Sequence, residues 1–293
     1  MRQRSHRRIV LAALTSLPVY YLSGCAHAGE AATQAGFAAL EKDLDGRLGV
    51  SALDTGSGRT LGYRQHERFP LCSTFKLVAA AAVLARDAEE PGFLQRHVPY
   101  TKDDLIVYSP VTERHVRAGM TLEQLCAATV IHSDNAAGNL ILRQIGGPEG
   151  LTRFARSIGD PMFRLDRWET ELNTALPGDP RDTTTPAAMT ATLNALVLGG
   201  VLPGSGRDLL TRWMIDCATG AARIRAGVPA GWKVGDKTGT GGYGSANDVG
   251  VIWPEGRAPI VLSVYTVRDE KDSKARSDIV AAATRLVAGR LAG

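Results

Sequence analysis

Four short groups of residues along the chain could carry chemistry. The first, Ser73-Thr74-Phe75-Lys76, places a hydroxyl and an amine three residues apart, so one helical turn would bring Lys76 beside Ser73. A neutral lysine amine can accept the hydroxyl proton and make the oxygen a nucleophile, and a helix N-terminus favours the developing negative charge. A Ser-x-x-Lys motif also arises by chance, so its weight depends on the other groups.

The second group, Ser133-Asp134-Asn135, lies between two segments that are expected to be helical. A hydroxyl and an amide on such a turn can move a proton and hold a substrate carbonyl. Ser, Asp and Asn are also common N-cap residues, so a helix cap explains the same three residues and is preferred when they are taken singly.

The third group, Lys237-Thr238-Gly239-Thr240, belongs to an expected strand. Its cation and hydroxyls could bind a carboxylate, and Gly239 would let a ligand approach the backbone. A solvated strand end is the alternative interpretation for this motif alone.

The fourth group lies in the charged segment 164–182, which contains Pro177, Gly178 and Pro180. Long irregular segments in compact domains are usually functional. Glu169 and Asn173, four residues apart, could together hold a water molecule for attack, although a solvated surface loop would fit the same residues.

Hydrophobic periodicity predicts the elements that must position these groups. Helices are expected at residues 37–48, 73–86, 122–131, 136–145, 151–158, 186–198 and 277–291. Strands are expected at residues 47–54, 60–65, 232–238, 247–253 and 260–267. Strands at both chain ends around a helical middle predict an α/β (α+β) fold, with one sheet built from both ends and a helical domain inserted. The site should lie between these two parts, because clefts favour domain boundaries.

Taken together, the four groups resemble the motif set of the class A serine β-lactamases. Ser73, Ser133, Glu169 and Lys237 follow one another at separations of 60, 36 and 68 residues. The resemblance runs from about Phe37 to the C-terminal helix, and includes residues 108–113 and 164–182. It implies the fold shared with penicillin-binding proteins: an antiparallel sheet from both chain ends, flanked by helices, with an inserted all-helical domain. The expected bounds are 25–71 with 216–293 for the α/β domain, and 72–215 for the helical domain.

The resemblance implies hydrolysis of the β-lactam amide of penicillins and cephalosporins through a serine acyl-enzyme, and hence antibiotic resistance. Ser73 would be the nucleophile, activated by Lys76, and Ser133 would pass a proton to the lactam nitrogen. Glu169 with Asn173 would hold and deprotonate the hydrolytic water. Whether Lys76 or Glu169 is the acylation base stays open at this point. No metal and no cofactor are expected.

Substrate contacts follow from the same resemblance. The substrate carboxylate would bind the strand motif, through Lys237, Thr238, Gly239 and Thr240. The backbone N–H groups of Ser73 and Thr240 would form the oxyanion hole. Asn135 would hold the acylamide side chain, and Tyr108 would stack at the cleft mouth.

Several positions depart from or refine the family pattern. Many relatives have an arginine where this chain has Ala246. Arg223 matches the place from which another subgroup of the family supplies that positive charge, and the alternative is that Arg223 is a solvated arginine.

Cys72 precedes the nucleophile as in carbapenem-hydrolysing members, but Gly241 replaces their second cysteine. The missing bridge argues against broad carbapenem hydrolysis, while Gly241 and Gly242 could admit bulky cephalosporins. Arg167 and Asp182 match an ion pair that pins the catalytic loop.

The first residues predict export. Basic residues 2–8 precede an apolar stretch at 9–22, whose 14 residues are too few to span a membrane as a helix. Leu22-Ser23-Gly24-Cys25 resembles a lipobox, which predicts a signal peptide at 1–24 and a periplasmic protein anchored through a lipid on Cys25. Ordinary cleavage after Ala28 also fits, and Arg7-Arg8 leaves Sec and twin-arginine export open.

The net charge of +4 is explained by this signal. Without its four arginines, the chain carries 30 basic and 30 acidic residues, so no nucleic-acid partner is expected.

Four cysteines are too few for a disulfide framework, and Cys126 is expected in the core. The six histidines lack metal-ligand spacing. The mature protein is expected to be a monomer whose partners are small β-lactams.

Two other functions use the same serine and lysine motifs. A penicillin-binding transpeptidase or carboxypeptidase, and a lipoprotein sensor that signals while acylated, would both keep a persistent acyl-enzyme. Glu169 and Asn173 favour hydrolysis over both, because a trap has no use for a base that activates water.

Overall fold

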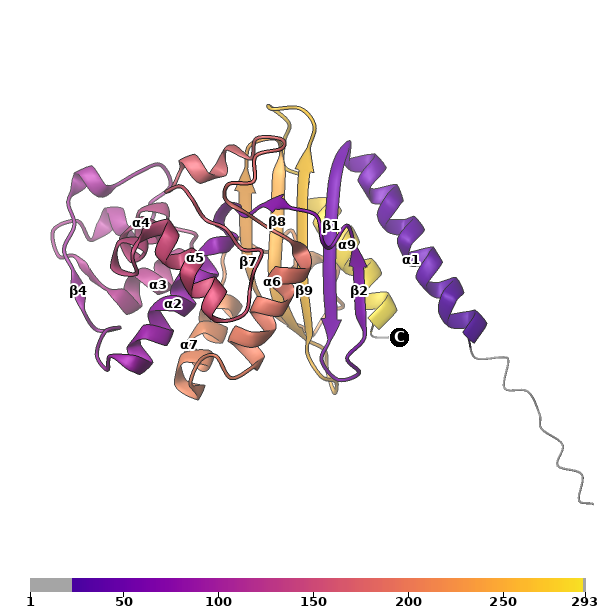
Figure 1. The fold of residues 1–293 in the computed structure, drawn as a ribbon, viewed down its shortest axis with the longest axis horizontal. Coiled ribbons are helices and arrows are strands. Elements are labelled where there is room, and N and C mark those ends of the chain that lie inside the picture. The colour runs from indigo at the N-terminus through magenta and orange to yellow at the C-terminus, as the bar shows by residue number, and fades with distance from the viewer. Residues whose placement is uncertain (1–22, 292–293) are drawn as a thin grey trace, which may run out of the picture.

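A five-stranded antiparallel sheet forms the centre of the molecule (Figure 1). The computed structural model describes residues 23–291, and their side chains from Gly29 onward. The strand order is β2-β1-β9-β8-β7, with bounds β1 (Gly46–Asp54), β2 (Thr60–Tyr63), β7 (Lys233–Gly241), β8 (Ser245–Trp253) and β9 (Ile260–Arg268). Strand β1 pairs with β9 along its whole length, so the two ends of the chain meet in one sheet, as the sequence predicts.

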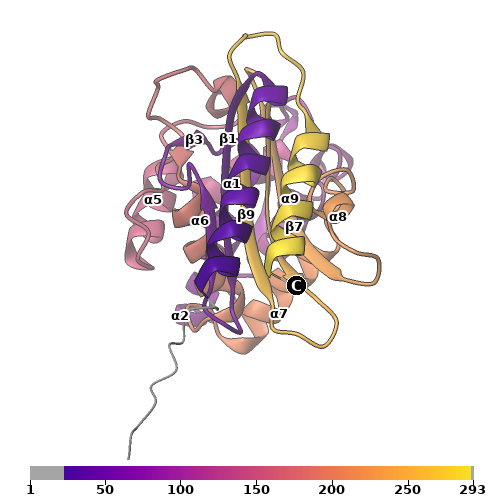
Figure 2. The same cartoon turned by 90° about the vertical axis from the view of Figure 1, so that its right-hand side faces the viewer.

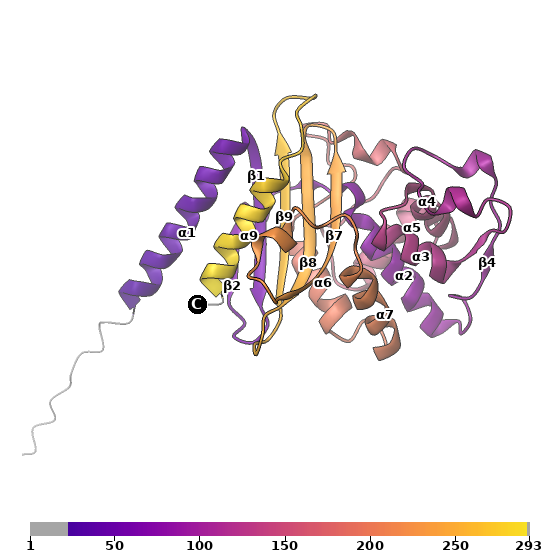
Figure 3. The same ribbon diagram turned by 180° about the vertical axis from the view of Figure 1, so that it is seen from behind.

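Helices cover both faces of this sheet. On one face lie α1 (Ser23–Leu44), α9 (Ser277–Leu291) and the short α8 (Ile224–Gly227) (Figure 2). On the other face, α6 (Pro186–Leu193) contacts β1 and β9, α7 (Gly204–Ile215) contacts β7, and a π-helical turn at 194–198 extends α6. Beyond them the helical part contains α2 (Phe75–Glu89), α3 (Leu122–Ile131), α4 (Asn135–Gln144) and α5 (Gly147–Ser157) (Figure 3).

Two pairs of two-residue strands join the loops of the helical part. They are β3 (Phe69–Pro70) with β6 (Thr183–Thr184), and β4 (His97–Val98) with β5 (Met120–Thr121). Short 3₁₀ turns complete it, at Cys72–Thr74, Lys102–Asp104, Thr112–Arg114 and Glu171–Thr174.

The two-residue period of the strands divides the interior into two cores. In β8, Val249 and Val251 point into the core shared with the central helices, whereas Ile252 points into the core under α1 and α9. Strands buried on both faces need apolar residues at successive positions rather than in alternation. Apolar residues therefore occupy successive positions at 249–253 in β8 and at 260–262 and 264–265 in β9.

The predicted elements are confirmed in type, with shifts at their ends. The helix expected at 37–48 ends at Leu44, because Gly46 already begins β1, and it starts much earlier, at Ser23. Helices α7 and α8 were not predicted; α7 opens on Gly-Ser-Gly, which has low helix propensity. The domain bounds remain a prediction.

Most of the predicted signal peptide, residues 1–22, lies outside the described residues, as does the side chain of Cys25. Within the described part of the chain, no helix combines the length and apolar character that a membrane span requires.

Candidate active site

Ser73 and Lys76 lie where the chain enters the first central helix. Ser73 is in the 3₁₀ turn Cys72–Thr74, and Lys76 is in the first turn of α2, whose residues from Phe75 to Leu84 are all buried. The predicted one-turn spacing brings Lys76 Nζ to 3.0 Å from Ser73 Oγ. A helix fixed in the core thus holds the hydroxyl and the amine in contact.

Lys76 is completely buried and surrounded by acceptors. Its Nζ lies 3.0 Å from Glu169 Oε1, and it donates to Asn135 Oδ1 at 2.5 Å and to the Ser133 carbonyl oxygen at 2.8 Å. Burial lowers the pKa of Lys76, and the Glu169 carboxylate opposes this effect. Burial therefore favours the neutral amine at Lys76, whereas the Glu169 carboxylate favours the charged one.

Glu169 is held rigidly over Ser73. Ser73 Oγ donates to Glu169 Oε1 at 3.3 Å, and Asn173 Nδ2 donates to Glu169 Oε2 at 2.5 Å. The side-chain amide of Asn139 fixes the backbone of Glu169 with two hydrogen bonds. Its NH₂ donates to the Glu169 carbonyl oxygen and its oxygen accepts from the Glu169 N–H, both at 3.0 Å. The peptide bond between Glu169 and Thr170 is cis.

Ser133 bridges the two buried lysines. Lys237 Nζ donates to Ser133 Oγ at 3.1 Å, and Lys76 Nζ lies 3.5 Å from the same oxygen. Burial lowers the pKa of Lys237 to about 8. Such a hydroxyl can give its proton to a substrate and recover one from a neighbouring amine.

The cap interpretation of the second motif is confirmed for one of its residues only. Asp134 is the N-cap of α4, accepting from Ala137 N at 2.9 Å, and it also accepts from the N–H groups of Val111 and Thr112. Ser133, with φ of +58°, and Asn135 instead line the cleft. The same turn therefore provides the cap of a helix, Asp134, and two residues of the cleft, Ser133 and Asn135.

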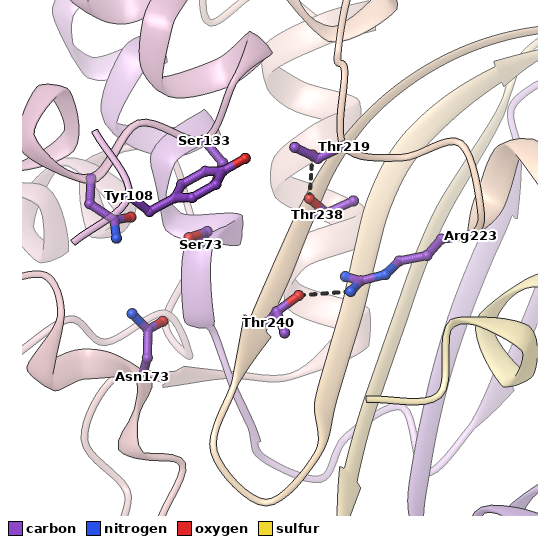
Figure 4. A pocket seen from close by; sticks show the side chains of 9 residues that line it. Ser73, Tyr108, Ser133, Asn173, Thr219, Arg223, Thr238 and Thr240 are labelled. Carbon is purple, nitrogen blue, oxygen red and sulfur yellow. Dashed lines mark hydrogen bonds between the residues drawn. The ribbon is translucent and has the colours of Figure 1, made fainter. Parts of the chain in front are cut away.

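The cleft has a volume of about 350 Å³ and lies between the helical part and strand β7 (Figure 4). Among its lining residues are Ser73, Tyr108, Ser133, Asn135, Asn173, Thr219, Arg223, Thr238 and Thr240. Tyr108 is 57% exposed at the mouth. The structure thus brings the predicted residues of all four groups to one place.

Arg223 lies against the strand motif rather than in solvent. Its residue exposure is 7%, and its guanidinium donates to Thr240 Oγ1, to the Gly239 carbonyl and to the Asn247 carbonyl, each at 2.7 Å. The alternative of a solvated arginine is therefore wrong. A fixed guanidinium beside two threonine hydroxyls is suited to binding a carboxylate.

The predicted ion pair at the ends of the catalytic loop is confirmed. Arg167 Nε lies 2.5 Å from Asp182 Oδ2, and Asp182 Oδ1 accepts from the N–H groups of Asp166 and Arg167.

Cys126 lies in the core as predicted, with no exposed surface. Cys72 is a free buried thiol, and a Cβ placed on Gly241 would lie 2.7 Å from its Sγ.

Two residues at the site were not predicted. Asn139 positions Glu169, and its signal was its place four residues after Asn135, on the same face of one helix. Thr219 lines the cleft and shares a 2.6 Å hydrogen bond with Thr238 Oγ1. No sequence pattern marks Thr219.

Within residues 23–291, no cluster of three or more histidine, cysteine or acidic side chains could hold a metal ion.

This arrangement defines a class of protein: an enzyme with a buried serine, two lysines and a carboxylate in one cleft. Comparison with known proteins gives the family. The model of the Beta-lactamase enzyme family matches residues 32–291. The chain belongs to this family, with class A members as relatives, and it is a hydrolase that acts on β-lactams and confers resistance to them.

Three similar proteins illustrate the match. The carbapenem-hydrolyzing β-lactamase KPC of Klebsiella oxytoca is 52% identical over 96% of both chains. β-Lactamase SME-1 of Serratia marcescens is 53% identical over 84% of this chain and 85% of its own. A crystal structure of a β-lactamase from Desulfarculus baarsii has a TM-score of 0.89 and 58% identity, covering 90% of this chain and 98% of that one. The predicted fold and enzyme class are confirmed.

Proposed function

We propose that Ser73 attacks the β-lactam carbonyl and forms an acyl-enzyme. Its proton passes to the neutral amine of Lys76 or to the Glu169 carboxylate, which lie 3.0 Å and 3.3 Å from Ser73 Oγ. The N–H groups of Ser73 and Thr240 stabilise the oxyanion. The C–N bond of the lactam then breaks, and Ser133 gives its proton to the departing nitrogen.

Glu169 and Asn173 complete hydrolysis in this proposal. They hold a water molecule beside the ester, and Glu169 takes its proton as the water oxygen attacks the acyl carbon. The ester C–O bond then breaks, and Ser73 Oγ receives the proton from Glu169, which releases the open acid. The observation that carries the proposal is the position of the Glu169 carboxylate, which contacts both Ser73 Oγ and Asn173 Nδ2. A transpeptidase or a sensor would have no use for this pair.

The substrate carboxylate binds at the β7 end of the cleft. Lys237 and Arg223 supply positive charge, and Thr238 and Thr240 supply hydroxyls, while Gly239 leaves room at the backbone. On the other wall Asn135 holds the acylamide and Tyr108 covers the ring. These assignments are supported by the lining of the cleft and by the contacts of Arg223 with β7.

The proposed substrates are penicillins and cephalosporins. One relative is named for carbapenem hydrolysis, but Cys72 faces a glycine in this chain, so a disulfide with residue 241 cannot contribute. We therefore place carbapenems below the other two classes. The enzyme acts as a monomer.

The protein is exported and works in the periplasm, held to the membrane only by a lipid on Cys25. The sequence of residues 1–25 supports this part of the proposal. Growth with labelled palmitate would test it, with Cys25→Ala as the control that should lose the label.

One experiment separates hydrolysis from the alternatives: nitrocefin turnover, with intact-mass detection of the adduct. Many turnovers per molecule are expected, and Ser73→Ala should form no adduct. A wild-type protein that stops after one equivalent would instead be a penicillin-binding enzyme or a sensor.

A further inference from the structure

Two buried aspartates lie beside the cleft, on the sheet face that α8 and α9 cover. Asp236 is in β7 and Asp248 is in β8, and neither has any exposed surface. Asp248 is paired with Thr238, and Asp236 with Gly250, so the two side chains share one face of neighbouring strands, one diagonal step apart. Two unshielded negative charges at this spacing would repel strongly in a buried site.

Each aspartate has one oxygen engaged by the segment that follows Arg223. Asp236 Oδ1 accepts from Arg225 Nε at 2.6 Å, and Asp248 Oδ2 accepts from the N–H of Ile224 at 3.0 Å. The second oxygen of each, Asp236 Oδ2 and Asp248 Oδ1, is buried without any other partner. Such acceptors are costly unless they are paired, and one proton between the two carboxyls would satisfy both.

The surroundings are closely packed, and besides Asp248 the Cys217 thiol also interacts with the Asp236 carboxyl. A Cβ on Gly220 would overlap Asp236 Oδ2, and a Cβ on Gly250 would lie 3.2 Å from Asp236 Cβ, so glycines close the site on both sides. The titratable and charged groups that face the pair are Arg225, Arg223, Lys237, Cys217 and Tyr265.

The balance of charge indicates which carboxyl is neutral. Burial raises the pKa of both aspartates, and the Asp236 charge raises that of Asp248 further. The Arg225 guanidinium opposes burial at Asp236, where it forms an ion pair. The ion pair with Arg225 thus favours the negative charge on Asp236 and the proton on Asp248.

We propose that Asp236 and Asp248 share one proton, held on Asp248, and that this pair positions Arg223 for the substrate carboxylate. Asp248 fixes Ile224 and Asp236 fixes Arg225, the two residues after Arg223. The Arg223 guanidinium is thereby directed at Thr240 and the strand motif. Asp248 is a positioning residue, since it acts through Arg223, and this part of the inference rests on the proposed function.

The kinetic test compares Asp248→Asn with Asp248→Ala. The amide keeps both bonds, because its oxygen accepts from Ile224 N–H and its NH₂ donates to Asp236. Asp248→Asn should therefore keep wild-type kinetics, whereas Asp248→Ala should raise KM for benzylpenicillin about tenfold with a smaller change in kcat.

The methyl ester of benzylpenicillin supplies the readout that a general structural defect would not give. Since the ester lacks the carboxylate, its KM should be the same for Asp248→Ala and wild type. Ser263→Ala, which removes a buried hydroxyl on the opposite face of the sheet, is the matched control and should not distinguish acid from ester. Equal effects of Asp248→Ala on acid and ester, or an Asp248→Asn variant as impaired as Asp248→Ala, would overturn the positioning role.

The shared proton is tested without any substrate. An aspartate whose folded pKa is raised stabilises the fold at low pH and loses that contribution as pH rises above its ordinary value of 3.8. Between pH 5 and 8, the unfolding constant of the wild type should rise relative to that of Asp248→Asn by up to about tenfold per pH unit. A pH-independent ratio would refute the shared proton. If the wild type hydrolysed no β-lactam, the proposed function would fail while this measurement still decided the proton.

Discussion

Replacing Glu169 by alanine is the sharpest test of how the cleft works. Ser73 and Lys76 keep their 3.0 Å contact, so acylation by the Lys76 route survives. The water that cleaves the ester loses its base, and general-base catalysis is worth about 10²–10⁴ in rate. Hydrolysis should therefore slow by about that factor, and penicillin should accumulate on Ser73.

The same change alters the electrostatics of Lys76. Glu169 raises the pKa of Lys76 against burial, so its removal lowers that pKa further and increases the fraction of neutral amine. Breaking a buried ion pair costs about 3–5 kcal/mol of stability, part of which the lysine recovers by losing its proton. Because the folded pKa lies below the ordinary 10.5, stability is lost as pH falls, and the variant should be most fragile in acid.

The assay is intact-mass spectrometry after mixing with benzylpenicillin, together with steady-state turnover. Glu171→Ala is the matched control, since it removes an exposed carboxylate from the same loop and should turn over like wild type. Unchanged turnover by Glu169→Ala, or loss of the adduct together with turnover, would refute the assigned role of Glu169.

Three further predictions concern specificity, stability and pH. A side chain at Gly241 would meet Cys72 Sγ and the Asn173 carbonyl, at 2.7 and 2.8 Å from its Cβ, so Gly241→Asn should lower cefotaxime turnover several-fold; equal turnover would contradict the open-edge hypothesis. Asp182→Asn removes the charge that pairs with Arg167 and should cost about 3 kcal/mol in chemical denaturation, whereas a loss near zero would exclude a pinning role. Because the pKa of Lys237 is about 8, KM for penicillins should rise as pH increases through 8, and a flat KM between pH 7 and 9 would argue against its role.

Local patterns predicted most of the fold. Hydrophobic periodicity predicts helices α3 and α9 with their observed ends, and the structure adds a capping box at Thr121 where α3 begins. Helices α7 and α8 were missed because their stability comes from packing against β7 and α9 rather than from propensity. Tertiary contacts of this kind leave no periodic signal.

The site was predictable where its residues form motifs. Ser73 and Lys76 belong to one helical turn, so their contact follows from spacing alone. Arg223 was identified only by resemblance, since its bonds to Gly239 and Asn247 depend on how β7 and β8 pair. Asn139 acts through two hydrogen bonds with Glu169, and only its spacing from Asn135 hints at this role. Thr219 acts through its contact with Thr238, which no local rule reveals.

Helices α1 and α9 lie side by side on the sheet face that points away from the helical part and the cleft (Figures 2 and 3). Both ends of the described chain therefore leave the molecule on the side remote from Ser73. A bead, an electrode or a reporter domain joined to either end would leave the cleft open to solvent. The fold is thus suited to use as an immobilised antibiotic sensor without redesign of its topology.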